Sequence, residues 1–134
     1  MGADVGKRKS EVKWINRSLV TSPYYIGLCT SEKKFAREMK RLKVPKLERR
    51  AFLKSGSDAT THLFDARQGR DNCAIVCIKR GKTKRTQVHS LLVHEAMHVW
   101  RAICVRIGED TPSDEFAAYS VQSISQRLME VYKK

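Results

Sequence analysis

The stretch LLVHEAMHVW, residues 91–100, places three polar side chains inside a run that is otherwise apolar. Apolar residues recur around it from about residue 87 to residue 107, and a glycine follows. This pattern predicts one long central helix that is buried nearly all round and ends at the glycine. Burying His94, Glu95 and His98 without partners would cost on the order of several kcal/mol where a charge is involved. The sequence therefore predicts that another group interacts with these three side chains and offsets the free-energy cost of burying them.

The spacing of the two histidines favours a metal ion as that group. Residues four positions apart lie about one turn from each other on one helix face, so His94 and His98 can both reach one zinc ion at about 2.0–2.1 Å. Glu95 is offset by about 100° around the helix and cannot easily ligate the same ion, but it can reach a water molecule bound there. The motif His-Glu-x-x-His thus predicts a Zn²⁺ site in which Glu95 is the general base.

A catalytic zinc site needs a third protein ligand and leaves its fourth position to water. Glu115 is the preferred candidate, because it follows His98 by seventeen residues and lies early in the next predicted helix. Asp114 beside it is the alternative. Thr111 as the cap and Pro112 at the first helical position predict where that helix begins, and it is expected to pack back against the motif helix.

The remaining sequence predicts a small sheet and further helices. The expected strands are 24–29, 61–66 and 73–79, and the last two form an antiparallel hairpin. One helix is expected from a cap at 30–31 to about residue 42, followed by a short helical piece to about residue 53. The C-terminal helix is expected to end at about residue 132. Together these elements predict a single α+β domain over residues 1–134, with a small, mostly antiparallel sheet, the buried motif helix and a packed C-terminal helix. Residues 1–12 are expected to form a flexible basic arm.

The motif HEAMH, followed by DEFAAY at residues 114–119, resembles the gluzincin arrangement of zincin metallopeptidases, in which a glutamate on the following helix is the third ligand. The nearest likeness is to small metallopeptidases encoded by phages and prophages, and SprT-like and ImmA/IrrE-like proteins are more distant. SprT-like proteins use a third histidine, whereas no histidine follows His98 here. The likeness covers about Thr61 to Tyr132 and implies a minimal zincin core, whose edge strand lies beside the cleft and pairs with extended substrate.

The resemblance also implies an activity, namely hydrolysis of a peptide bond in a peptide or protein substrate. Zinc-bound water, activated by Glu95, would attack the peptide carbonyl, and Glu95 would then pass the proton to the leaving amine. Tyr119, one turn beyond Glu115, would donate a hydrogen bond to the oxyanion. A phage-encoded protein of this kind would act in the host cytoplasm.

The charge of the chain is strongly positive and uneven. The formal net charge is +13; residues 1–59 carry 15 basic and 6 acidic side chains, whereas residues 60–134 carry 12 and 8. Such a field attracts polyanions. The N-terminal half is thus a candidate surface for nucleic acid, an acidic partner or an anionic membrane, with a merely solubilising surface as the alternative.

Cysteine usage and hydropathy favour a cytoplasmic protein. The four cysteines, at positions 29, 73, 77 and 104, form no Cys-x-x-Cys pair, and we expect reduced thiols in the core. The first ten residues contain no apolar run, and no stretch of 18 uninterrupted apolar residues occurs anywhere. Neither a signal peptide nor a membrane span is predicted.

Other interpretations of the motif stay open. The two histidines could each have a carboxylate or backbone partner by coincidence, or they could hold a structural zinc ion closed by further cysteine or histidine. The leading rival function is a basic nucleic-acid-binding or regulatory protein that holds zinc for stability and has no hydrolytic activity. A combination is a peptidase recruited to nucleic acid by the basic face of the helix at 31–42, formed by Lys33, Lys34, Arg37, Lys40 and Arg41.

Overall fold

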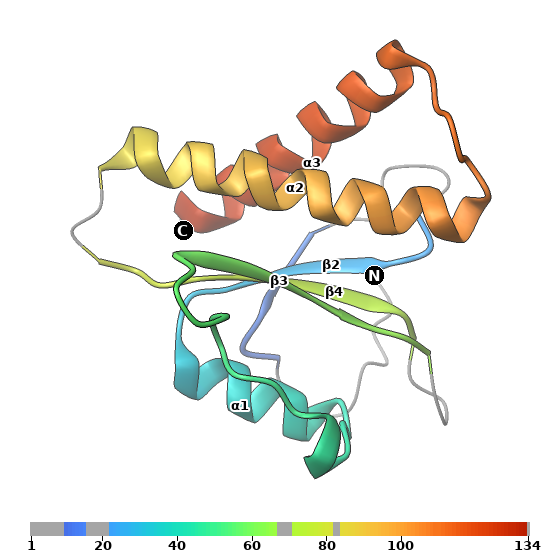
Figure 1. Cartoon of the computed structure of the whole chain (residues 1–134). Coiled ribbons are helices and arrows are strands. Elements are labelled where there is room, and N and C mark those ends of the chain that lie inside the picture. The colour runs from blue at the N-terminus through green and yellow to red at the C-terminus, as the bar shows by residue number, and fades with distance from the viewer. Residues whose placement is uncertain (1–9, 16–21, 67–70, 82–83, 134) are drawn as a thin grey trace.

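A four-stranded mixed sheet lies between two layers of helix (Figure 1). The computed structural model describes residues 10–15, 22–66, 71–81 and 84–133. The strands are β1 (Lys13–Trp14), β2 (Tyr25–Cys29), β3 (Ala59–Phe64) and β4 (Cys73–Ile78). The helices are α1 (Glu32–Arg41), a 3-10 turn (Lys46–Glu48), α2 (Arg85–Ile107) and α3 (Asp114–Lys133). The predicted α+β class is confirmed.

The order of the strands makes β3 an edge. Across the sheet the order is β1-β2-β4-β3. β2 pairs with β4 in parallel, with Cys29 opposite Cys77, and the other two neighbouring pairs are antiparallel. The β3–β4 hairpin and the mostly antiparallel sheet are as predicted, and in the part of the chain that the structure describes one side of β3 has no neighbouring strand.

β4 is the central strand of the core, because helices cover both faces of the sheet: α1 lies on one face, and α2 and α3 lie on the other (Figure 1). All six residues of β4 are buried, and alternate side chains of a strand point to opposite faces. Ala74, Val76 and Ile78 therefore join the core under α2 and α3, whereas Cys73, Ile75 and Cys77 join the core over α1. A continuous apolar run such as CAIVCI suits a strand covered on both sides.

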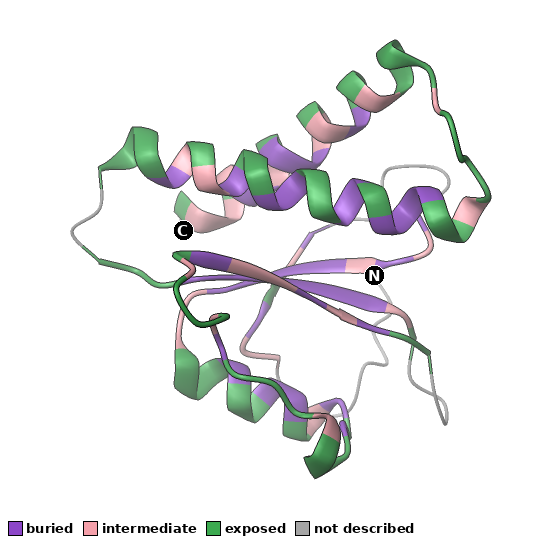
Figure 2. Cartoon of the chain, in the orientation of Figure 1, coloured by how far each residue is buried: buried purple, intermediate pink, exposed green. Residues whose placement is uncertain are grey.

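α2 has the predicted length, and it ends at Gly108, whose φ of 75° is a left-handed conformation that glycine adopts at little cost. The expectation that this helix is buried nearly all round is wrong. Val93, Met97 and Val105 are exposed, and Figure 2 shows exposed positions recurring along α2. The sheet and α3 cover only two sides of the helix, so a third side faces solvent.

α1 begins at its predicted cap, where the Ser31 hydroxyl accepts a hydrogen bond from the backbone N–H of Lys34. Phe35, Met39 and Leu42 are buried, and four of the five basic side chains that we expect on the opposite face are exposed. Arg41 is the exception, because its guanidinium forms an ion pair with the buried carboxylate of Glu38. A buried carboxylate requires such a partner, and this one removes Arg41 from the basic face.

α3 begins at Asp114, and Ser113 caps it. The Ser113 hydroxyl accepts a hydrogen bond from the backbone N–H of Phe116 at 3.2 Å, and its carbonyl accepts one from Ala117 at 3.0 Å. The expected cap at Thr111 is therefore wrong by two residues. The helix runs to Lys133, and its residues Ile124 and Leu128 are buried in the core.

Two smaller expectations need correction. Residues 1–9 of the expected flexible arm lie outside the described residues, but residues 10–12 are packed: Val12 is buried, and the Ser10 hydroxyl accepts a hydrogen bond from Trp14 Nε1 at 2.8 Å. The short helical piece expected up to about residue 53 is only the 3-10 turn at Lys46–Glu48. A segment of bends, with a turn at residues 55–56, then leads to β3.

The cysteines are packed in the core as expected. Cys29, Cys73, Cys77 and Cys104 are all buried free thiols. Burial raises the pKa of the Cys77 thiol, whereas a hydrogen bond with Cys77 lowers the pKa of Cys29. No helix within the described ranges has the length and apolarity needed to cross a membrane.

Candidate metal centre

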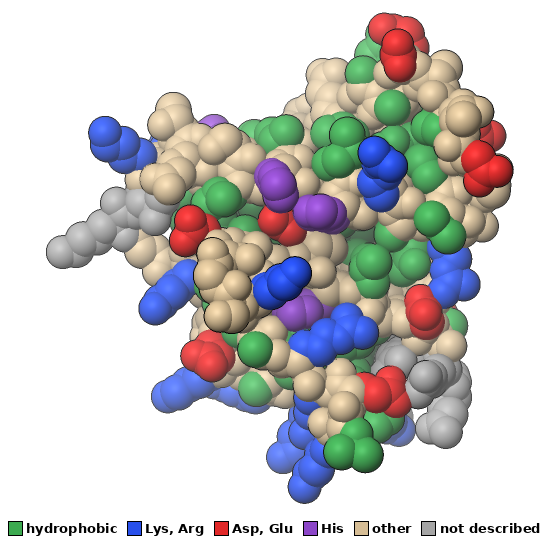
Figure 3. Space-filling model, in the orientation of Figure 1, with side chains coloured by type: hydrophobic (Ala, Val, Ile, Leu, Met, Phe, Trp, Pro, Cys, Tyr) green, Lys and Arg blue, Asp and Glu red, His purple; other side chains and the backbone are tan. Residues whose placement is uncertain are grey.

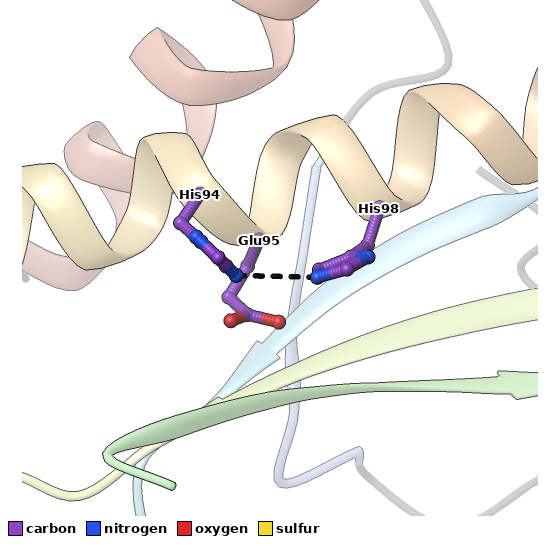
Figure 4. A group of neighbouring side chains, drawn as sticks. All are labelled: His94, Glu95 and His98. Carbon is purple, nitrogen blue, oxygen red and sulfur yellow. Dashed lines mark hydrogen bonds between the residues drawn. The ribbon is translucent and has the colours of Figure 1, made fainter.

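Three side chains of α2 converge beside the edge of the sheet. His94 and His98 are exposed, Glu95 is 5% exposed, and one ligand atom from each lies within 4.8 Å of the other two. Figure 4 shows both rings and the carboxylate pointing away from the helix axis to the same side, where β3 passes beneath. This cluster is formed by the residues predicted from the motif, and it is the one such group among the residues that the structure describes.

The geometry of the two imidazoles fits a shared ion. Their Nε2 atoms are 3.3 Å apart, and the rings meet edge to face with centroids 5.0 Å apart. Two nitrogens bound at about 2.0–2.1 Å to one tetrahedral zinc ion would lie roughly 3.3–3.4 Å apart. An N–H···N hydrogen bond between the rings is also possible at this separation, but it is longer than most N–H hydrogen bonds. The nitrogens are thus spaced as zinc ligands and are open to solvent.

Glu95 is oriented by a residue outside its own helix. Its Oε1 accepts a hydrogen bond of 2.7 Å from the hydroxyl of Thr61, in the middle of β3. The carboxylate is thereby held between the edge strand and the two histidines. The motif predicts the role of Glu95 but gives no sign of Thr61, which lies 34 positions earlier in the chain.

Glu115 does not belong to this cluster, and neither does Asp114. Both are exposed in the first turn of α3, which begins well above the sheet and then runs down behind α2 (Figure 1). α3 starts only after α2 has continued nine residues, about 14 Å of helix, beyond His98. The structure therefore brings Glu95 to the histidines but not the acidic residues proposed as third ligand.

Tyr119 is also remote from the cluster. Its side chain is 67% exposed and lines a hollow of about 500 Å³ together with Trp14, Ile15 and the adjacent side of α3. Neither histidine nor Glu95 lines this hollow. The structure gives Tyr119 no access to a reacting group beside Glu95.

His62 is a residue of the core. It is 6% exposed, its ring stacks on Phe35, and its Nε2 is 2.9 Å from the carbonyl oxygen of Phe52. Because the carbonyl can only accept, Nε2–H is the donor. Burial lowers the pKa of His62 below its usual 6.5. As the neighbour of Thr61 on β3, it points to the opposite face of the sheet and cannot join the metal cluster.

The far end of β3 is partly closed by a basic side chain. The Arg50 guanidinium donates a 2.7 Å hydrogen bond to the carbonyl of Leu63 and lies 4.7 Å from the centroid of the Phe64 ring. Figure 3 shows histidine side chains at the surface in the middle of this face and Lys and Arg side chains gathered below them. The candidate centre thus adjoins a basic surface.

The chain matches no family model, no curated protein and no solved structure. The resemblance to small zincins therefore rests on the motif and on its geometry in this fold.

Proposed function

We propose that the protein is a zinc-dependent hydrolase, and specifically a metallopeptidase, in which His94 and His98 hold the ion and Glu95 is the general base. The observation that carries this proposal is the 3.3 Å spacing of the two Nε2 atoms with the Glu95 carboxylate directly beside them. Glu115, the third ligand suggested by the resemblance, is not part of the proposed site.

The chemistry is divided between the ion and the chain. Bound zinc supplies Lewis acidity, which polarises a carbonyl and acidifies water. Glu95 accepts a proton from the attacking water and returns it to the leaving amine. Its carboxylate lies beside the two histidines, where the Thr61 hydroxyl holds it for both transfers.

The fold favours a peptide as substrate. β3 is an edge strand, and edge strands bind extended peptides through backbone hydrogen bonds. Because Thr61 of this strand touches Glu95, a peptide paired with β3 would lie next to the proposed base. The four free, buried thiols fit a reducing compartment, and we propose the cytoplasm.

Metal analysis combined with Glu95→Gln tests the proposal on the full chain. Wild-type protein purified without chelator should contain close to one zinc per chain and cleave members of a broad peptide library. Glu95→Gln should keep the zinc and lose cleavage by at least about 100-fold, because a positioned base contributes roughly 10²–10⁴-fold. A wild-type protein that binds no zinc, or a Glu95→Gln variant that cleaves equally well, would contradict it.

A second candidate function, nucleic-acid binding with a structural zinc ion, is favoured by the exposed basic side chains of α1. Lys33, Lys34, Arg37 and Lys40 all face solvent, although Arg37 is paired with Glu11 at 2.7 Å. Reversing the charges of the other three should abolish salt-sensitive DNA binding if this face makes the contact. Unchanged affinity would reject the face as a nucleic-acid surface.

A further inference from the structure

The hydroxyl of Thr61 is placed to control where the Glu95 carboxylate points. Among the described residues it is the hydrogen-bond partner of that carboxylate, at 2.7 Å from Oε1, whereas the backbone oxygen of Glu95 is 3.5 Å away. The hydroxyl has one proton, and the shorter, charge-assisted contact receives it. The bond crosses from the edge strand to the helix, so it ties two elements together at the candidate centre.

Without this bond Glu95 has another favourable position. A glutamate side chain has three rotatable bonds, and a Glu95 oxygen already lies within 4.8 Å of one ring nitrogen of each histidine. Carboxylate oxygen is a good zinc ligand. The helical offset of Glu95 disfavours it as a ligand, but its carboxylate lies close enough that a released Glu95 can turn toward the ion and bind it, which would leave the centre without a free base.

We propose that Thr61 is a positioning residue that holds Glu95 off the metal ion, so that the carboxylate acts as a base and not as a third ligand. This inference rests on the proposed function, because it requires an ion at His94 and His98. Its physical basis is that a neutral donor fixes the carboxylate without removing its charge. In the opposite arrangement Glu95 is itself a ligand of the ion and Thr61 only orients it, and variants of Thr61 would then behave differently.

Cobalt(II) alone is a suitable probe, because its visible absorption reports the ligands around it. We would titrate the full chain and its Thr61→Val, Thr61→Ser and Glu95→Gln variants with CoCl₂, together with the double variant Thr61→Val/Glu95→Gln. Valine keeps the shape and strand preference of threonine, and the half-buried position should tolerate it. Thermal unfolding in EDTA would verify that each variant is folded.

In Thr61→Val we expect a changed cobalt spectrum and binding that is equal to wild type or up to about tenfold tighter, as Glu95 joins the ligands. Thr61→Ser should restore the wild-type spectrum, and the double variant should match Glu95→Gln. A Thr61→Val spectrum identical to wild type would overturn the inference. So would cobalt binding weakened by roughly 10–100-fold in Thr61→Val, which is the usual effect of losing the support of a true ligand. If the wild type binds no cobalt, the proposed metal site itself is wrong. That outcome differs from an unchanged spectrum or weakened binding in Thr61→Val alone.

Discussion

Stabilisation by zinc is the most direct measure of the proposed centre, and His98→Ala should abolish it. The His98 imidazole is exposed, and its described polar contact is with His94, so its loss should change the metal-free stability by only about 0.5 kcal/mol. With free zinc at about 100 times the dissociation constant, the wild type should gain roughly 2.7 kcal/mol. For a chain of 134 residues this corresponds to an increase in Tm of about 10 °C.

The assay is thermal unfolding with EDTA and then with buffered zinc. His98→Ala should show almost none of the wild-type shift, because one imidazole alone binds zinc far more weakly than two on one face. The matched control is His89→Ala, a half-buried histidine of α2 outside the cluster, which should keep the full shift. A wild type that is indifferent to zinc, or a His98→Ala variant that responds as strongly as wild type, would refute the reasoning.

Three further outcomes follow from the structure. Glu115→Gln should change the zinc affinity by less than about twofold, since Glu115 lies outside the cluster; a loss of about 100-fold in a zinc competition titration would restore it as a ligand. Because burial lowers the pKa of His62, the unfolded state binds more protons, and stability should fall as the pH drops below 6.5. Urea unfolding at pH 7.5 and pH 5.0 should show a smaller decrease for His62→Gln, and an equal decrease in both proteins would contradict the assignment. Arg41→Met should lower the free energy of unfolding at pH 7 by about 3–5 kcal/mol, because it leaves the buried Glu38 carboxylate without its cation; a change below about 1 kcal/mol in urea titration would show that the pair is dispensable.

The features that follow from local pattern were predictable. The apolar run of α2 and the glycine after it fix the length of the helix, and the period of four residues puts His94 and His98 on one face whatever the rest of the chain does. The apolar stretch at residues 73–78 likewise indicates a buried strand, though not its place in the sheet. These predictions depend only weakly on how each segment packs against the rest of the fold.

The features that depend on how elements pack were not predictable. The spacing between His98 and Glu115 is compatible with a metal ligand on the next helix. Whether the Glu115 carboxylate reaches the histidines depends on where α3 packs against α2, and no residue pattern predicts that position. Thr61 offered no signal either, because a threonine in a strand is ordinary until the opposing side chain is known. The burial of His62 and Arg41 was not predictable for a related reason. Each lies beside a particular polar partner, the Phe52 carbonyl or the Glu38 carboxylate, which only the tertiary structure supplies.

The contact between Arg50 and the carbonyl of Leu63 has a consequence for solubility. An open edge strand is a template on which further copies of a chain can stack into fibrils, and a charged side chain that occupies one of its acceptors interrupts that stacking. This contact lies at Leu63, and the Arg50 guanidinium does not cover the middle of the strand at Thr61. Pairing of a second copy of the chain is thereby opposed at Leu63, while a short extended ligand keeps access to the strand beside the proposed base, Glu95.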